Sequence, residues 1–179
     1  MDDIIIRHCA PALAGLKTAN LVSCKIQDAC ECIMKNGKAL AKKGIYMTIL
    51  CEKNENALLY VYRNQRLYED LNCREARDIL IDFGYTSSDT DECIERLKAR
   101  IQSNPCFPHE IGLFLGYPAP DVKGFIEHKG KDFKCMGYWK VYCNECEARK
   151  TFEKYKKCID VYTRVYLEGA SIEKLTVAV

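Results

Sequence analysis

Long hydrophobic runs and an excess of either charge are both missing from this chain of 179 residues. A helix that spans a bilayer needs roughly 18 to 20 apolar residues, whereas runs such as 111–117 are far shorter. The 27 basic and 25 acidic residues leave a net charge of +2, which gives no sustained attraction to a phosphate backbone. We therefore expect no membrane and no nucleic acid among the partners.

Positive charge is also missing at Met1-Asp2-Asp3, where a secretory signal would carry it. We therefore expect no export signal and a cytoplasmic location. The twelve cysteines are numerous, and an even count in a secreted protein would suggest disulfides. In a reducing cytosol they are instead expected to stay thiols and to pack as small hydrophobic residues.

Glycine and proline are scarce, with 10 and 5 residues, while 48% of the chain is apolar. This composition is typical of a globular protein rather than a disordered one. The length suits one domain with its own core. We predict a single domain over residues 1–179 of the α+β class.

A small mixed or antiparallel sheet is predicted from three segments. Two aromatic and aliphatic stretches flank a polar connector and form a β-hairpin at about 45–63, and further strands are expected near 111–115 and 133–143. The stretch Asn20 to Ile26 is ambiguous between strand and loop. Several helices should pack on this sheet.

The longest of these helices is predicted at about 144–168. Asn144 with Glu147 has the form of a capping box. An apolar stripe that should face the core recurs there at steps of three and four, namely Phe152, Tyr155, Ile159, Tyr162 and Tyr166. By contrast, Pro11 should end a first short helix near Ala10, because proline cannot donate a backbone hydrogen bond.

A histidine next to a carboxylate, His109-Glu110, opens the predicted strand at 111–115. Imidazole and carboxylate are the usual acid and base partners near neutral pH, so these two residues are the candidate catalytic pair. Neighbours on an extended segment point to opposite faces, however, and the pair would share one substrate only if the backbone turned at Pro108. The alternative is that one side chain orders the loop.

The turn Gly116-Tyr117-Pro118 follows the predicted strand and precedes a predicted helix. Free N–H groups at a helix start can bind an anion, which makes this turn a candidate ligand site. Asp121 in the first turn of the helix could satisfy the same N–H groups and is the more frequent solution.

Cysteines at the start of the long helix, Cys143 and Cys146, could form a dithiol redox site or half of a metal site. The second thiol pair of a zinc ribbon is missing. Only a fold that brings Cys106 and His109 against Cys143 and Cys146 would supply four ligands for zinc or iron. We assign no metal.

The sole tryptophan lies in the run Gly137-Tyr138-Trp139-Lys140. An aromatic pair beside a lysine could wall a pocket for a planar or anionic ligand. On a strand, Tyr138 and Lys140 would share one face and Trp139 would take the other, so at most one of these sets would line a cavity. We expect Trp139 in the core.

Two motifs, Pro108-His109-Glu110 and Leu115-Gly116-Tyr117-Pro118, resemble the signature motifs of a bacterial family known only as a domain of unknown function. The stretch from Cys9 to Leu21 is also similar to that family, and the resemblance adds Lys17 to the candidate ligand residues. Resembling members come largely from anaerobic Firmicutes, which agrees with the many thiols. The resemblance implies no activity and no cofactor.

These observations favour a cytosolic binding or regulatory domain for a small molecule or anion. Its pocket is expected near the two motifs, with Gly116, Tyr117, Pro118, Asp121 and Lys17 as ligand residues. One alternative is an enzyme that uses His109 and Glu110 in acid–base or metal-assisted chemistry. The other is a thiol redox or metal protein that uses Cys143 and Cys146. The cofactor and the oligomeric state stay unknown.

Overall fold

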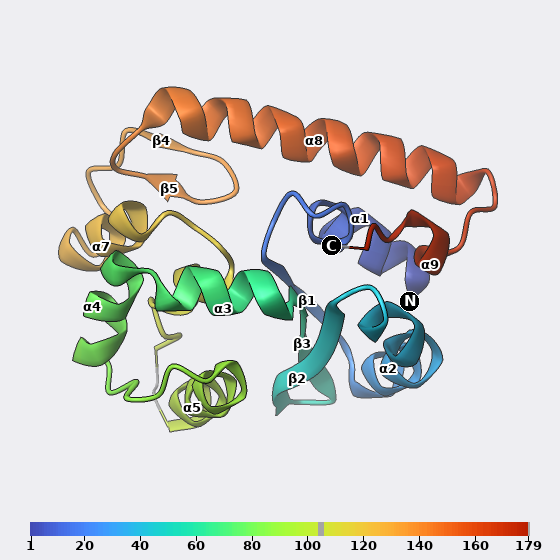
Figure 1. The fold of residues 1–179 in the computed structure, drawn as a ribbon, viewed down its shortest axis with the longest axis horizontal. Helices are drawn as coiled ribbons and strands as arrows, with labels where there is room; N and C mark the ends of the chain where they lie inside the picture. Colours follow the sequence, from blue (N-terminus) through green and yellow to red (C-terminus); the bar gives the residue numbers. More distant parts are fainter. Residues whose placement is uncertain (104–105, 179) are drawn as a thin grey trace. The chain divides into compact units, whose positions relative to one another are not determined.

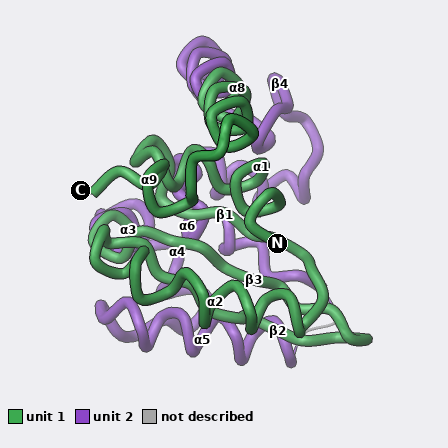
Figure 2. The backbone as a smooth tube through the Cα atoms, turned by 90° about the vertical axis from the view of Figure 1, so that its right-hand side faces the viewer, with its two compact units in different colours: residues 1–67, 155–179 green, residues 68–154 purple. Residues whose placement is uncertain are grey.

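The computed structural model describes residues 1–103 and 106–178 of the chain. Backbone contacts group them into two compact units, one of residues 1–67 and 155–179 and one of residues 68–154, coloured green and purple in Figure 2. The fold is α+β, as the sequence predicts. Among the described residues, no helix is both long and apolar enough to cross a membrane. The single-domain organisation stays a prediction.

The first unit contains a three-stranded antiparallel sheet with the order β1-β3-β2. Its strands are β1 (Ala19–Lys25), β2 (Ile45–Lys53) and β3 (Asn56–Arg63). The β2–β3 pair confirms the hairpin predicted at about 45–63. Its tight turn holds Asn54 and Glu55 at φ of 49° and 62°, the left-handed values that a two-residue hairpin turn requires.

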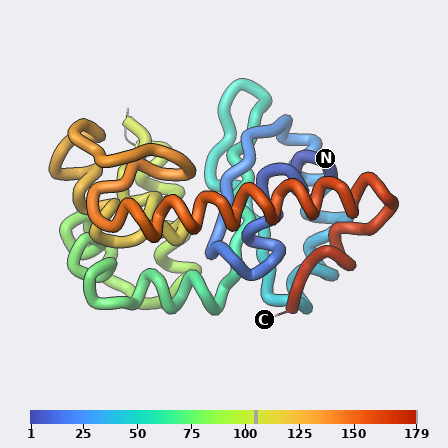
Figure 3. Tube along the Cα trace, turned by 90° about the horizontal axis from the view of Figure 1, so that it is seen from above, coloured from blue at the N-terminus to red at the C-terminus, as the bar shows by residue number. Residues whose placement is uncertain are grey.

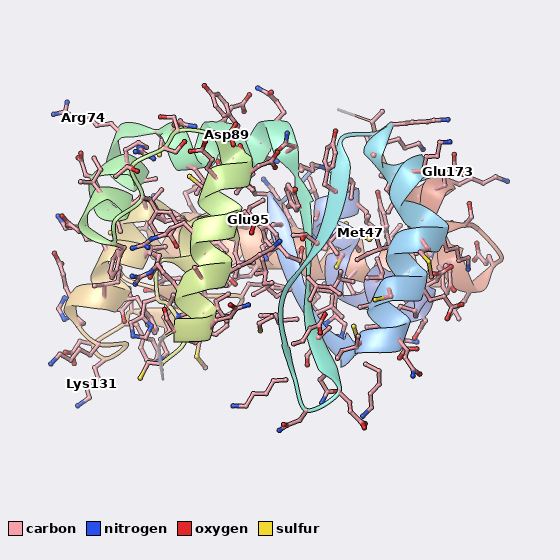
Figure 4. All side chains as sticks on the ribbon, turned by 90° about the horizontal axis from the view of Figure 1, so that it is seen from below. Met47, Arg74, Asp89, Glu95, Lys131 and Glu173 are labelled. Atoms are coloured by element: carbon pink, nitrogen blue, oxygen red, sulfur yellow. The ribbon has the colours of Figure 1, made fainter. Side chains whose placement is uncertain are left out.

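One face of this sheet carries the core of the first unit. Alternation along β3 places Ala57, Leu59 and Val61 in one buried cluster with side chains of the helices that cover the sheet. Those helices are α1 (Asp2–Leu13), α2 (Ile26–Ala41) and α9 (Ile172–Leu175). Figure 1 shows α2 beside β2, and Figure 4 shows Met47 of β2 between that strand and α2.

The break predicted near Ala10 is wrong, because α1 continues through Pro11 to Leu13. The Pro11 carbonyl accepts the N–H groups of Leu16 and Lys17 at 2.8 and 3.0 Å, which closes the end of the helix. A proline in the last turn removes one backbone hydrogen bond. Here the helix is buried along this turn, and packing offsets that loss.

The end of α1 is also held by a buried arginine of β3. Arg63 donates through Nε to the Ala12 carbonyl at 2.6 Å, and through Nη2 to the carbonyls of Leu13 and Val177 at 2.7 and 2.8 Å. Its side chain is 3% exposed. The guanidinium therefore ties the sheet to the last turn of α1 and to the C-terminal segment of this unit.

The second unit is built mainly from helices. Its elements are α4 (Arg74–Asp82), α5 (Thr90–Ser103), α6 (Ile111–Phe114), α7 (Ala119–Glu127), β4 (Cys135–Met136) and β5 (Lys140–Val141). Asp89 caps α5 by accepting the N–H groups of Asp91 and Glu92, each at 3.0 Å, and Figure 4 shows it at the start of that helix. The helix α3 (Asn64–Asn72) begins in the first unit and ends in the second.

Two of the predicted strands are wrong. The segment 111–115 forms α6 instead, and all five of its residues are buried, so their continuous apolar pattern could not separate a strand from one buried helical turn. The segment 133–143 is not one strand but a small hairpin, in which Cys135 pairs with Val141 and Met136 with Lys140.

The long helix predicted at about 144–168 is confirmed as α8 (Glu145–Leu167), which Figure 3 shows as one unbroken helix. Asn144 accepts the Glu147 N–H at 3.3 Å, which is one half of the predicted capping box. Tyr155 and Tyr162 of the predicted apolar stripe face the first unit's interior: Tyr155 is buried, and Tyr162 packs against the core cluster.

Candidate functional site

A cavity of about 490 Å³ lies within the second unit. Its wall comes from the segment before α6, from α6 and the turn after it, from one face of α7 and from the β4–β5 hairpin. The residues that line it are Phe107, Pro108, His109, Ile111, Gly112, Tyr117, Asp121, Val122, Phe125, Met136, Gly137, Tyr138, Trp139 and Lys140. The wall is mostly apolar and aromatic, as in most small-molecule pockets.

Two stacked rings form one side of the cavity. Tyr117 and Trp139 lie with ring centroids 5.2 Å apart and an interplanar angle of 28°. Trp139 also packs against Phe152 in a T-shaped pair, with ring centroids 4.6 Å apart and an interplanar angle of 79°. Burial raises the pKa of Tyr117 to about 12, so its phenol stays protonated at neutral pH. The cavity therefore presents flat, uncharged surfaces on this side.

The β4–β5 hairpin brings the tryptophan to the cavity. Tyr138 and Trp139 lie between the two strands, in a turn where the strict alternation of side chains does not hold. The expectations that only one face of this segment lines a cavity and that Trp139 belongs to the core are therefore wrong, because Tyr138, Trp139 and Lys140 all line it. Gly137 is required here, since a Cβ atom would overlap the Phe152 ring.

Asp121 fixes the position of this hairpin. One carboxylate oxygen accepts the indole N–H of Trp139 at 2.8 Å, and the other accepts the backbone N–H groups of Tyr142 and Cys143 at 2.8 and 2.9 Å. The side chain is 3% exposed. Asp121 thus holds the hairpin wall of the cavity by hydrogen bonds, and it does not cap α7 as the sequence suggested.

Only one residue of the turn Gly116-Tyr117-Pro118 lines the cavity. Tyr117 lines the cavity, whereas Gly116 and Pro118 are not among the lining residues that the structure describes. At the start of α7 the N–H groups of Asp121 and Val122 already donate to the Pro118 carbonyl at 2.9 and 3.1 Å. Pro118 and Pro120 have no N–H, so this helix start gives little support for an anion site.

His109 and Glu110 are not brought together in one concave site. His109 is exposed on the cavity wall, with its ring edge against Phe125 at a centroid distance of 5.1 Å. Glu110 is fully buried and forms an ion pair with Arg100. It also accepts the Tyr85 hydroxyl at 3.2 Å, and burial followed by the charge of Glu110 raises the pKa of Tyr85. The predicted acid–base pair is therefore not assembled.

Lys17 is buried in the first unit, with 4% of its side chain exposed, and the cavity of the second unit is built without it. Burial lowers the pKa of its ammonium to about 8, and the neighbouring Cys9 acts in the opposite direction. Desolvation disfavours the charged form of a lysine, which accounts for this direction. The placement of Lys17 gives no support for a role as ligand residue in the cavity.

The cysteines form no disulfide, and all twelve are free thiols. Cys106, Cys143 and Cys146 are exposed. Within residues 1–103 and 106–178, no group of three or more histidine, cysteine, aspartate or glutamate side chains is placed to hold a metal ion. The convergence of Cys106 and His109 with Cys143 and Cys146 therefore does not occur.

Several cavity residues gave no functional signal in the sequence. Phe107, Phe125 and Met136 are isolated apolar residues in different segments, and their pattern does not distinguish a cavity wall from a core. The signal that could have joined two of these segments is the buried Asp121, which needs three N–H donors and finds them in the hairpin.

A family model described as "Protein of unknown function (DUF3793)" matches residues 5–176 of the chain. This match confirms the resemblance to a family of unknown function that the motifs indicated. No curated protein and no solved structure matches the chain.

Proposed function

The chain belongs to the DUF3793 family of proteins of unknown function, and we propose that this member binds a small aromatic molecule in the cavity of its second unit. The single observation that carries the proposal is the stacked pair of Tyr117 and Trp139 on the wall of a cavity of about 490 Å³. Pockets for small molecules have volumes of about 300 to 1,000 Å³ and mostly apolar walls.

The cavity wall is held in place by the protein itself. Asp121 accepts the indole N–H of Trp139, and Phe152 packs against the same ring. A wall whose rings are already ordered loses little side-chain freedom when a ligand arrives. This arrangement supports a binding role more strongly than an unsupported apolar hollow would.

The enzyme alternative is not supported, because its two candidate residues do not lie in one site. Glu110 is buried with Arg100, so the cavity retains only His109 of the proposed pair. A general base without a placed partner does not define a reaction. The thiol alternative rests only on the exposure of Cys143 and Cys146 and receives no further support.

We also propose a cytoplasmic location and reducing surroundings. The support is the set of twelve free thiols, five of which are exposed. Exposed thiols oxidise or exchange in an oxidising compartment, and secreted proteins with many cysteines usually pair them.

The test uses the sole tryptophan, Trp139, as a reporter on the cavity wall. We expect phenylnaphthylamine, a neutral aromatic probe, to quench tryptophan emission by energy transfer and to saturate at one probe per chain. Phe107→Ala should weaken binding, because Phe107 lines the cavity. Tyr68→Ala is the matched control, since Tyr68 is an exposed aromatic residue at 48% that does not line it.

Tyr117 gives a second pair of variants. Tyr117→Ala removes the ring that stacks on Trp139 and should abolish saturable binding, whereas Tyr117→Phe retains the ring and should bind normally. Circular dichroism checks that each variant is folded. Equal binding by Phe107→Ala, Tyr117→Ala and the unmodified protein would contradict the proposed site.

A further inference from the structure

The charged groups of the cavity differ in how fully they are already used. The Asp121 carboxylate accepts three N–H groups, one of which is the indole N–H of Trp139. The carboxylate and the indole N–H are therefore already hydrogen-bonded within the cavity wall. His109 and Lys140 are the other side chains on the wall that can carry a charge. Both are donors when protonated, and neither can then accept a hydrogen bond.

The ammonium of Lys140 is held at a defined place beside the cavity. Its Nζ donates to the Gly130 carbonyl at 2.7 Å and lies 4.9 and 5.6 Å from the ring centroids of Phe133 and Phe125. An ammonium has three N–H bonds, so this hydrogen bond leaves two. Among the residues that the structure describes, no carboxylate forms an ion pair with Lys140. The cavity therefore contains a positioned cation that is not ion-paired with any described carboxylate.

The segment that carries the carbonyl partner of Lys140 adds positive charge. Residues 128–134, between α7 and β4, include three lysines and one aspartate. Lys131 of this segment projects outward near the end of α7 (Figure 4). A net positive charge near a site attracts ligands of the opposite sign and raises their association rate.

From these observations we infer that the ligand of this cavity is an aromatic anion. Its flat body lies against Tyr117 and Trp139, and its carboxylate, sulfonate or phosphate group accepts hydrogen bonds from Lys140, with His109 as a second donor. This inference rests on the proposed function, since it names the chemical class of the molecule that the cavity binds. A hydrogen bond to a charged group is stronger than a neutral one, and an apolar wall strengthens it further.

The experiment compares two probes that share one ring system. Anilinonaphthalene sulfonate carries a sulfonate, and phenylnaphthylamine is the same ring system without it. We expect the sulfonate probe to bind at least about tenfold more tightly, as one charge-assisted hydrogen bond allows. Loss of binding in Tyr117→Ala places each probe in the cavity, and raising the salt concentration should weaken only the sulfonate probe.

Variants of Lys140 identify the recognition group. Lys140→Met should lower the affinity for the sulfonate probe about tenfold and leave the affinity for the neutral probe unchanged. Lys140→Arg, which keeps the charge, should restore the difference between the probes. Lys123→Met is the control, because Lys123 is exposed on α7 outside the cavity and pairs with Glu127.

The two proposals fail in different ways. Equal affinity for both probes, or an equal loss for both in Lys140→Met, would overturn the anionic ligand while leaving an aromatic site. Tight binding of the sulfonate probe that Tyr117→Ala leaves unchanged would also overturn it, because the anion would then bind elsewhere. Failure of both probes to bind would overturn the aromatic site itself.

Discussion

The first unit and the cavity of the second unit differ in what their charged side chains contact. In the first unit, Arg63 is buried against three backbone carbonyls, and the apolar side chains of the sheet are sealed beneath helices. In the second unit, Asp121 is equally buried, but it orders a wall that faces an open volume. Lys140 lines the same cavity, and its ammonium donates one hydrogen bond, to the Gly130 carbonyl.

The contacts of a charged side chain indicate whether it stabilises the fold or is available to a ligand. A cation whose donors are used by carbonyls stabilises the fold and has nothing left for a ligand. A cation at the edge of an apolar cavity, with one donor used, contributes less to stability and more to recognition. Substitutions of Arg63 and of Lys140 should therefore affect different measurements, stability for Arg63 and binding for Lys140.

The largest effect is expected for Arg63→Met. The carbonyls of Ala12, Leu13 and Val177 would each lose a hydrogen bond to a charged donor, so we expect the free energy of unfolding to fall by about 4 kcal/mol. Urea denaturation measures this change. Arg66→Met in the same unit is the control, because Arg66 makes one hydrogen bond, to the Gly15 carbonyl, and should cost much less. Similar losses for both variants would remove the special role of Arg63.

Glu110→Gln tests the buried ion pair of the second unit. Arg100 would lose its counter-charge, and the new amide would place a donor where the buried Glu110 Oε2 has no hydrogen-bond partner. We expect a loss of about 3 kcal/mol, as is typical when a buried pair is broken. Glu127→Gln is the matched control, since its pair with Lys123 is exposed and should contribute almost nothing. A stable Glu110→Gln would show that Glu110 is not needed as an anion.

Alanine substitutions at two helical glycines, one in each unit, test how closely each helix is packed. A Cβ atom at Gly124 of α7 would lie 2.5 Å from Cγ of Tyr142, whereas at Gly37 of α2 the nearest atom is 3.8 Å away. Gly124→Ala should therefore lower the free energy of unfolding by about 2 kcal/mol. Gly37→Ala should raise it by about 0.5 kcal/mol through helix propensity. Thermal unfolding of both proteins measures the difference, and a stabilised Gly124→Ala would contradict the packing at Tyr142.

The smallest effect concerns the pH dependence of the first unit. Lys17 has a pKa of about 8 in the folded chain against an ordinary value of 10.5, so between these values the unfolded chain binds more protons and stability rises with pH. Relative to Lys17→Met, the unmodified protein should gain roughly 1 kcal/mol of unfolding free energy from pH 7 to 9. The exposed Lys42 is the control: Lys42→Met should change stability equally at both pH values. A constant difference for Lys17→Met would contradict the burial of its charge.

The sequence predicted elements whose signals are long or chemically specific. The hairpin at 45–63 has two extended apolar stretches and a polar turn, and α8 repeats its apolar residues from Phe152 to Tyr166. In contrast, residues 111–115 are too few and too uniformly buried for the spacing of side chains to reveal a helix. The strand β1 stayed ambiguous because its pairing with β3 depends on residues far away in the chain.

The candidate site was predicted only in part for the same reason. The motif around His109 and the residue Tyr117 do line the cavity, but its opposite wall comes from the hairpin at 135–141. The link between the two is one buried carboxylate, and a single sequence does not state which donors a carboxylate will find. The separation of His109 and Glu110 followed from the local backbone, and adjacency in the chain could not establish a shared role.

The hydrogen bonds of Asp121 bear on the rate at which a ligand would bind. Because the indole and the hairpin backbone are fixed when the chain folds, no rearrangement of this wall has to precede the encounter. Association should then follow a single exponential whose rate grows linearly with ligand concentration, without a plateau. In Asp121→Asn, whose amide supplies one acceptor oxygen in place of two, that rate should level off as the reordering of the wall becomes limiting.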